Sequence, residues 1–364
     1  MDLAGGYEAL PCAFLLSAGL IALLMKPALR VGWADRPSTR KHHHGPVPLV
    51  GGVAMCAAFS VSVFLQPEKP QGYPELLMGA ILLTAVGLYD DVRFVRPAAR
   101  FLFQIGAALW MVYGGGVVLD ELGDLFGLGP VYLGSIAVLF TVFGVVGAVN
   151  ALNMSDGLDG LAGGLALIAV AWLIVLNGLA PSPHAGDLNA LLGLAMAIAG
   201  FLVFNLRHRW RTRASVFMGD AGSTLLGFAL AWFMVRLSQG EGAVMAPMTA
   251  VWILALPLLD TVTVMTRRIR AGRNPCAADR QHLHHLLLGC GWSDGRVTAI
   301  LLAGAAGAGA LGVAAWWLRA PEFLQFYAFL GVFLLYYRFT TRMWARRQTA
   351  GDARDTDAAL VERS

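Results

Sequence analysis

Residues 150–179 read NALNMSDGLDGLAGGLALIAVAWLIVLNGL. The first part of this stretch is polar and rich in glycine, whereas the part from residue 161 onward contains no charged side chain. An apolar segment of 19 residues is close to the length that a helix needs to cross the hydrocarbon core of a membrane. The stretch therefore predicts a membrane-spanning helix that directly follows a polar loop.

The same apolar pattern recurs along the whole chain. The 364 residues are 57% hydrophobic and only 14% charged, against about 25% charged in a typical soluble domain. Charges this few cannot cover a soluble surface, which excludes a soluble enzyme, a disordered chain and a simple nucleic-acid binder. We predict an all-α polytopic bundle with about eleven spans. They lie near residues 9–29, 47–65, 75–90, 101–119, 131–149, 161–179, 188–206, 223–238, 243–265, 297–318 and 322–340.

The basic residues predict the orientation of this bundle, because Lys and Arg of short loops stay in the cytoplasm. With the N-terminus outside, 24 of the 27 basic residues lie inside, and only Lys69, Arg236 and Arg319 lie outside. We therefore predict an N-out, C-in topology, with residues 1–340 as one domain and a disordered tail over residues 341–364. The cytoplasmic loops cover residues 30–46, 90–100, 150–160, 207–222 and 267–296.

Acids and amides gather on this basic face, where carboxylates are costly and usually functional. The loop at residues 150–160 is the most informative, since Asp and Asn supply the oxygen ligands that Mg²⁺ prefers. Capping of helix ends is the alternative role for such residues, but four in ten residues exceed what one cap requires. The acids and amides are Asp90, Asp91, Asn150, Asn153, Asp156, Asp159 and Asp220.

The loop at residues 267–296 adds groups that suit anion recognition. No Cys or acid completes a tetrahedral zinc site with its histidines, and an arginine stands beside them. His42–His44 can likewise bind phosphate or form part of a solvated loop, and Asp260 can cap a helix, pair with an Arg or join the site. The anion-binding candidates of the loop are Arg280, His282, His284 and His285.

One motif is rejected. Residues 307–312 match the GxGxxG string of dinucleotide-binding proteins, but they lie inside an apolar span with no preceding strand. Small residues at this spacing favour close packing of membrane helices instead. Oxygen ligands for Mg²⁺, together with Arg and His for phosphates, suggest phosphoryl transfer between a soluble nucleotide donor and a lipid acceptor.

The motifs resemble those of the bacterial polyprenyl-phosphate N-acetylhexosamine-1-phosphate transferases, within them the WecA/TagO branch. They occur in the family's order over residues 35–285. In the related MraY branch, a His-His-x-Glu pattern is found, whereas here His284 and His285 are followed by leucines. The matching strings are DRPSTRKHHHGPVPLVGG at 35–52, GLYDDVRFVRPAAR at 87–100, NALNMSDGLDGLAGG at 150–164, VFMGDAGS at 216–223 and RAGRNPCAADRQHLHH at 270–285.

The resemblance implies a reaction at the cytoplasmic face of the bacterial inner membrane. Undecaprenyl phosphate would attack the β-phosphorus of UDP-GlcNAc, giving undecaprenyl-diphosphate-GlcNAc and UMP and starting the synthesis of a surface polysaccharide. The resemblance implies these two substrates as the partners and no binding of nucleic acid, and it is compatible with a homodimer.

The resemblance also implies residue roles. Asp220 and Asn153 would hold Mg²⁺, for which Mn²⁺ can substitute. Asp90 and Asp91 would face the lipid phosphate and, with Asp156, form the catalytic group. The nucleotide sugar would be bound by Asp159 toward the uracil and by Arg100, Arg280, His282, His284 and His285 at the diphosphate and sugar.

Two questions stay open at this point. A phosphate monoester has a second pKa near about 6, so Asp90 is either a general base or an electrostatic organiser. The donor is either UDP-GlcNAc or a sibling carrying GalNAc, QuiNAc or FucNAc. An ion-coupled transporter is a competing class, but transporter sites lie near the bilayer midplane, and these acids cluster at one face.

Overall fold

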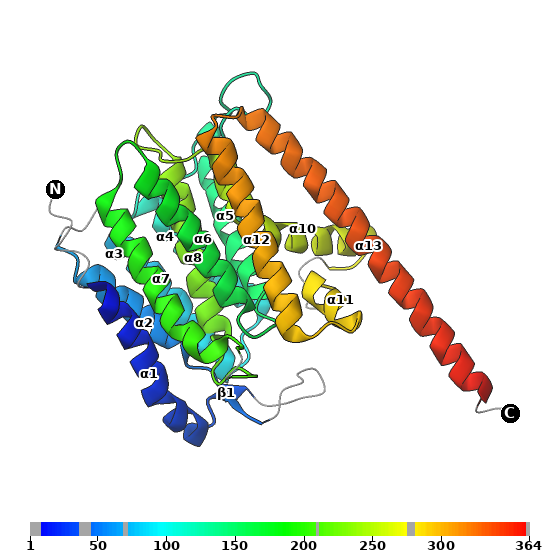
Figure 1. The fold of residues 1–364 in the computed structure, drawn as a ribbon. Coiled ribbons are helices and arrows are strands. Elements are labelled where there is room, and N and C mark those ends of the chain that lie inside the picture. Colours follow the sequence, from blue (N-terminus) through cyan, green and yellow to red (C-terminus); the bar gives the residue numbers. More distant parts are fainter. Residues whose placement is uncertain (1–8, 36–44, 68–71, 209–210, 275–280, 362–364) are drawn as a thin grey trace.

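The computed structural model describes residues 9–35, 45–67, 72–208, 211–274 and 281–361, which form an almost entirely helical bundle (Figure 1). A short antiparallel pair joins β1 (Ala34–Asp35) to β2 (Val47–Pro48). The helices are α1 (Ala9–Val31), α2 (Gly51–Phe64), α3 (Tyr73–Val92), α4 (Pro97–Tyr113), α5 (Ala137–Met154), α6 (Leu161–Leu179), α7 (Ala185–Asn205), α8 (Gly219–Ser238), α9 (Pro247–Ile253), α10 (Ala255–Arg270), α11 (Leu283–Gly289), α12 (Asp294–Trp317) and α13 (Glu322–Val361).

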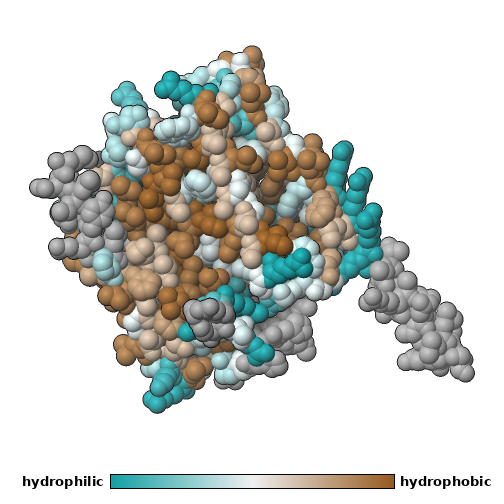
Figure 2. Space-filling model, in the orientation of Figure 1, coloured by the Kyte–Doolittle hydropathy of each residue, from teal (hydrophilic) through white to brown (hydrophobic). Residues whose placement is uncertain are grey.

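The predicted all-α membrane fold is confirmed. Within the described residues, seven helices are long and apolar enough to cross a membrane, or eight if the bent pair α9 and α10 counts as one. Each of the eleven predicted segments overlaps a helix or this pair, but the count of eleven spans and the N-out orientation stay predictions. Figure 2 shows hydrophobic residues over the flank of the bundle and hydrophilic residues toward its ends.

The predicted ninth span is wrong as a continuous helix. Residues 243–265 contain two helices, α9 and α10, which meet at an angle of 80°. Pro257 lies in the first turn of α10, where its missing N–H cannot bond to the carbonyl of Ile253, so the helix breaks there. In Figure 1, α10 consequently lies across the direction of its neighbours.

Helix α13 is described as far as Val361. The disorder of residues 341–364 stays a prediction. The helix leans away from the bundle along its length (Figure 1).

Helix α8 forms the centre of the bundle and packs against α2, α3, α5 and α6. Its side chains are buried along almost the whole length, and Phe228, Trp232 and Phe233 are fully buried. Gly52 of α2 and Gly87 of α3 touch the backbone of α8 at its first turn, where a Cβ atom would clash. These glycines let three chain segments meet at the N-terminal end of α8.

The interpretation of residues 307–312 as a helix-packing motif is confirmed. These residues lie within α12. A side chain at Gly309 would collide with Trp172, and one at Gly312 would collide with Trp252. The small residues therefore allow α12 to approach α6 and α9 closely.

Candidate active site

The last turn of α3 meets the first turn of α8 and brings three predicted carboxylates together. Asp91 accepts hydrogen bonds from the backbone N–H groups of Asp220, at 2.8 Å, and Ala221, at 3.3 Å. The first N–H groups of a helix have no partner within the helix, and a carboxylate there also interacts favourably with the helix dipole. Asp91 therefore holds the start of α8, and with it Asp220, against α3.

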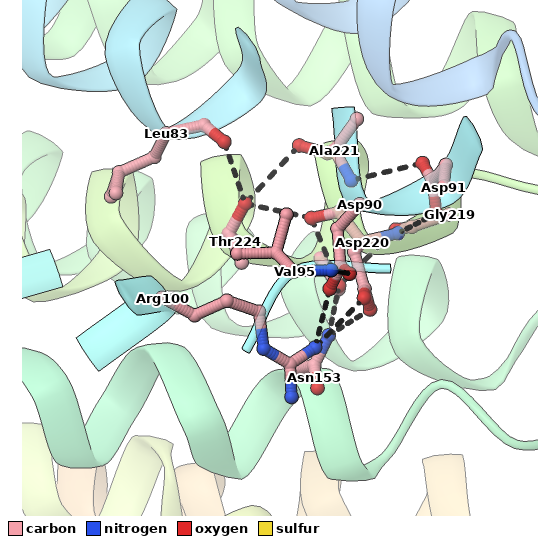
Figure 3. A network of polar contacts seen from close by, with 11 residues as sticks. Leu83, Asp90, Asp91, Val95, Arg100, Asn153, Gly219, Asp220, Ala221 and Thr224 are labelled. Atoms are coloured by element: carbon pink, nitrogen blue, oxygen red, sulfur yellow. Dashed lines mark hydrogen bonds and ion pairs between the residues drawn. The ribbon is translucent and has the colours of Figure 1, made fainter. Parts of the chain in front are cut away.

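Asp90 and Asp220 share one arginine (Figure 3). Nη1 of Arg100 lies 2.8 Å from Oδ2 of Asp90 and 3.0 Å from Oδ2 of Asp220. The other oxygen of Asp90, Oδ1, accepts a hydrogen bond of 2.7 Å from the backbone N–H of Val95. Both oxygens of Asp90 are thus engaged within the protein.

The stretch 150–160, predicted as a loop, is helical as far as Met154, and it contributes two further groups, one from the end of α5 and one from the turn that follows. Nδ2 of Asn153 donates to Oδ1 of Asp220 at 2.6 Å and to Oγ of Ser223 at 2.8 Å. Asp156 is exposed and lies close enough to Asp91 for the two carboxylates to repel each other. Asp90, Asp91, Asp156, Asp220, Asn153 and Arg100 therefore belong to one cluster, as the sequence predicts.

A pocket opens beside this cluster, between α3, α4, α5 and α8. One wall is apolar, and the other carries the Arg100 guanidinium, the side-chain amides of Asn150 and Asn153, and the Asp220 carboxylate. The pocket is lined by Leu83, Val86, Gly87, Arg100, Gln104, Asn150, Asn153, Asp220 and Thr224.

The charges of the cluster do not balance, because two carboxylates, those of Asp90 and Asp220, share the guanidinium of Arg100. Among the described residues there is no group of three or more His, Cys, Asp or Glu side chains arranged to hold a metal by themselves. Mg²⁺ is usually held by only one or two carboxylates, with water and substrate phosphates completing its shell. The partly exposed carboxylate of Asp220 and the amide of Asn153 have the right chemistry for such a site.

Asp159 is bound by groups of the protein. Its Oδ2 lies 2.6 Å from Nε of Arg207 and accepts a 2.9 Å hydrogen bond from the backbone of Ala214. Nη2 of the same arginine lies 2.7 Å from Asp294 at the start of α12. Asp159 thus braces the polar loop against two other segments, and its proximity to uracil stays a prediction.

The histidines are held more tightly than the sequence suggests. Nδ1 of His282 lies 2.7 Å from Oδ2 of Asp260. Oδ1 of Asp260 accepts a 2.9 Å hydrogen bond from the backbone N–H of Leu283, the first residue of α11, so Asp260 caps this helix and binds a histidine of the predicted site. Burial lowers the pKa of His284 to about 3. His284 is therefore neutral at physiological pH, and it can hydrogen-bond an anion but brings no positive charge to it. Arg280 and His42–His44 lie outside the described residues.

Several partners of these groups were missed in the sequence analysis. In the sequence, Arg207 was one of several basic residues of a loop, with no individual role. Tyr336 was one residue of the last apolar span, but its hydroxyl donates to Asp260 at 2.9 Å. Asp159 and Arg207 are separated by 48 positions and Asp260 and Tyr336 by 76. No local pattern in one sequence connects residues that far apart.

The described residues thus form a multi-pass helical bundle with an acidic, arginine-bearing pocket at one end, an arrangement that suits a membrane enzyme acting on phosphorylated substrates. Residues 73–238 match the model of glycosyl transferase family 4. The chain is 37% identical over 330 residues to the undecaprenyl-phosphate alpha-N-acetylglucosaminyl 1-phosphate transferase of Pasteurella multocida, covering 90% of this chain and 92% of the relative.

Transferases with the same name from other bacteria have similar sequence identity to this chain. The identity is 35% over 334 residues for the Haemophilus influenzae protein, with 90% of this chain and 92% of the relative covered. For Escherichia coli K12 it is 34% over 339 residues, with 91% and 90% covered. The chain belongs to this family of membrane phosphoglycosyl transferases, as the motifs indicated.

Proposed function

We propose that this protein transfers N-acetylglucosamine-1-phosphate from UDP-GlcNAc to undecaprenyl phosphate, releasing UMP. The observation that carries the proposal is the cluster in which Asp90, Asp220 and Asn153 surround Arg100 beside a pocket. The names of the relatives, which match along nine-tenths of the chain, give both substrates. Bringing two phosphate groups together is opposed mainly by charge repulsion, so a site of cations and cation ligands suits the reaction.

Asp220 and Asn153 are the residues that would hold Mg²⁺. When bound, the ion would reduce the repulsion between the two phosphates and stabilise charge on their oxygens. The amide of Asn153 can turn its oxygen toward a cation, because the nitrogen and oxygen of an amide exchange places by rotation. Asp91 keeps the Asp220 carboxylate at the mouth of the pocket through the start of α8.

Arg100 is the cation already present in the site. Its Nη1 divides its contact between two carboxylates, and its side chain is 35% exposed. A donor diphosphate could therefore take over part of this hydrogen bonding without burying the guanidinium further. Both Asp90 oxygens already have partners, which supports the role of Asp90 as an organiser of charge rather than as a general base.

The proposed location is the bacterial inner membrane, with the pocket in the cytoplasm and the product serving surface polysaccharide synthesis. The concentration of Lys and Arg in the loops on this side supports the orientation. A homodimer stays a separate prediction, which size-exclusion chromatography with light scattering on the detergent-solubilised protein would test.

Turnover with a panel of sugars tests the function directly. The purified protein is incubated with Mg²⁺, undecaprenyl phosphate and UDP-GlcNAc, UDP-GalNAc, UDP-QuiNAc or UDP-FucNAc in turn, and UMP is measured. We expect the fastest release with UDP-GlcNAc. Faster release with a different sugar would reassign the donor, and no release with any sugar would overturn the proposal.

A further inference from the structure

Helix α13 lies outside the segment that matches the family model, yet its polar side chains reach the histidine-bearing segment, residues 281–289. The hydroxyl of Tyr336 donates to Oδ1 of Asp260 at 2.9 Å. Eight residues further along the helix, Nε1 of Trp344 donates to the backbone carbonyl of Gln281 at 3.1 Å. These contacts join α13 to Asp260 of α10 and to Gln281, the residue immediately before the run His282–His285.

Asp260 connects the helix to the first histidine. This buried carboxylate accepts three hydrogen bonds: from Tyr336, from the backbone N–H of Leu283 at 2.9 Å and from Nδ1 of His282 at 2.7 Å. A carboxylate on one ring nitrogen fixes both the orientation of a histidine and the nitrogen that carries its proton. The Nε2 atom of His282 is thereby left to act on the opposite side of the ring.

The ring of His282 in turn packs against the ring of His284. The rings of His282 and His284 are stacked, with centroids 5.9 Å apart and planes 7° from parallel. His284 is only 3% exposed, and its Nε2 has no hydrogen-bond partner among the described residues. The same atom faces Gly157 so closely that a Cβ there would clash. The histidine-bearing segment therefore packs directly on the polar turn that follows Asn153 of α5.

We propose that α13 positions the histidine-bearing segment for the nucleotide sugar, with Tyr336 and Asp260 acting as positioning residues through His282. The proposal rests on the function proposed above, because it assigns the donor to these histidines. It adds the last helix, which carries none of the recognised motifs, to the parts of the chain that determine donor binding.

The location of α13 separates this role from general packing. The helix leans away from the bundle (Figure 1) and packs on α9, α10 and α11 rather than on the central helix α8. Most of its apolar side chains between residues 324 and 339 are exposed or only partly buried. Loss of one hydroxyl from this helix should therefore disturb the histidine-bearing segment much more than the core.

The first test compares Tyr336→Phe with the matched control Tyr337→Phe. The Tyr337 hydroxyl accepts an exposed hydrogen bond of 2.9 Å from Arg270 and does not reach Asp260. We expect Tyr336→Phe to raise the KM for the nucleotide sugar roughly threefold to tenfold, the effect of one hydrogen bond. The KM for the lipid phosphate should stay unchanged, the unfolding temperature should fall by only about 2–4 °C for one lost hydrogen bond, and the control should match wild type in all three.

The second test asks whether Tyr336 acts through His282. In a double-mutant cycle with His282→Asn, Tyr336→Phe should add little to the donor KM, because the group that it positions is already absent. Trp344→Phe, which keeps an aromatic side chain but replaces the indole and loses its N–H, should also raise the donor KM. A purely structural role predicts a lower unfolding temperature and a lower kcat with an unchanged donor KM, and this result would overturn the proposal.

Amide hydrogen exchange tests positioning without turnover. Residues 281–289 should exchange faster in Tyr336→Phe than in wild type or Tyr337→Phe, and equal rates would refute the positioning by α13. If wild-type protein releases no UMP, the proposed function and the assignment to the donor both fail, while the exchange experiment still decides whether α13 orders this segment.

Discussion

At each of their two ends, helices α3 and α8 take part in a polar cluster that contains carboxylate groups, and the two clusters differ in how well these groups are paired. At one end, Asp187 is 1% exposed and is bound by Tyr73 at 2.6 Å, Arg236 at 2.8 Å and His184 at 3.1 Å. At the other end, Asp90 and Asp220 must share Arg100. The first cluster has a donor for each oxygen, and the second has more negative charge than its cation can balance.

This difference separates a structural cluster from a functional one. A buried carboxylate is tolerated when its oxygens are hydrogen-bonded and its charge is paired. Asp187 meets both conditions and joins α3, α7 and α8. The acids around Arg100 meet the first condition but not the second, because the carboxylates of Asp90 and Asp220 share one guanidinium. The Asp220 side chain is 32% exposed, so it is the acid of this pair that a cation can reach. Residue type alone would place both clusters in the same category.

The largest expected effect is on activity at the unbalanced end. Asp220→Asn should reduce the rate of UMP release about 10²–10³-fold, the usual cost of losing one electrostatic group from a site. Its ion pair is about one-third exposed, so stability should change by no more than about 1 kcal/mol. Kinetics and thermal unfolding of the same preparation check both statements. A large fall in unfolding temperature would place Asp220 in the structural category with Asp187.

The next largest effect is on stability at the balanced end. Asp187→Asn leaves the Arg236 guanidinium without its counter-charge, and breaking a buried pair in this way costs about 3 kcal/mol or more. Because Arg236 is 26% exposed, we expect the lower end of that range. The rate per folded molecule should stay near the wild-type value. Chemical unfolding and active-site-normalised turnover measure the two quantities, and a specific loss of turnover would break the comparison.

The smallest expected effect is the dependence of folding stability on pH, and it concerns His284. Burial lowers the pKa of His284 to about 3, whereas an unfolded histidine titrates near about 6.5. Between these values the unfolded chain binds the extra proton, so stability falls as the pH is lowered, by up to about 1.4 kcal/mol per pH unit. Above pH 6.5 the effect should vanish.

The measurement is the unfolding free energy of wild type and His284→Gln between pH 7.5 and 5. The variant lacks the buried imidazole, so its stability should fall less steeply below pH 6.5. Parallel curves for the two proteins would show that His284 becomes protonated within the folded protein.

The membrane fold and the chemistry of the pocket were both predictable from sequence, for local reasons. Hydropathy over about 20 residues is sufficient to locate a spanning helix, and α6 begins and ends at the predicted residues 161 and 179. The acids Asp90, Asp91 and Asp220 drew attention because charges are rare in this chain. The break between α9 and α10, just before Pro257, was missed because the sequence stays apolar on both sides of it while the helix direction changes.

By itself the sequence determined an apolar helical bundle with its acids, amides and cations concentrated in a few polar loops, and it contained the motifs of the family. Only the tertiary structure decided which of these groups meet. It placed Asp220 beside Arg100, Asp159 on Arg207 and Asp260 between His282 and Tyr336. The physical reason is that hydropathy and residue chemistry are local properties, whereas the partners of a buried charge are chosen by the packing of helices far apart in the chain.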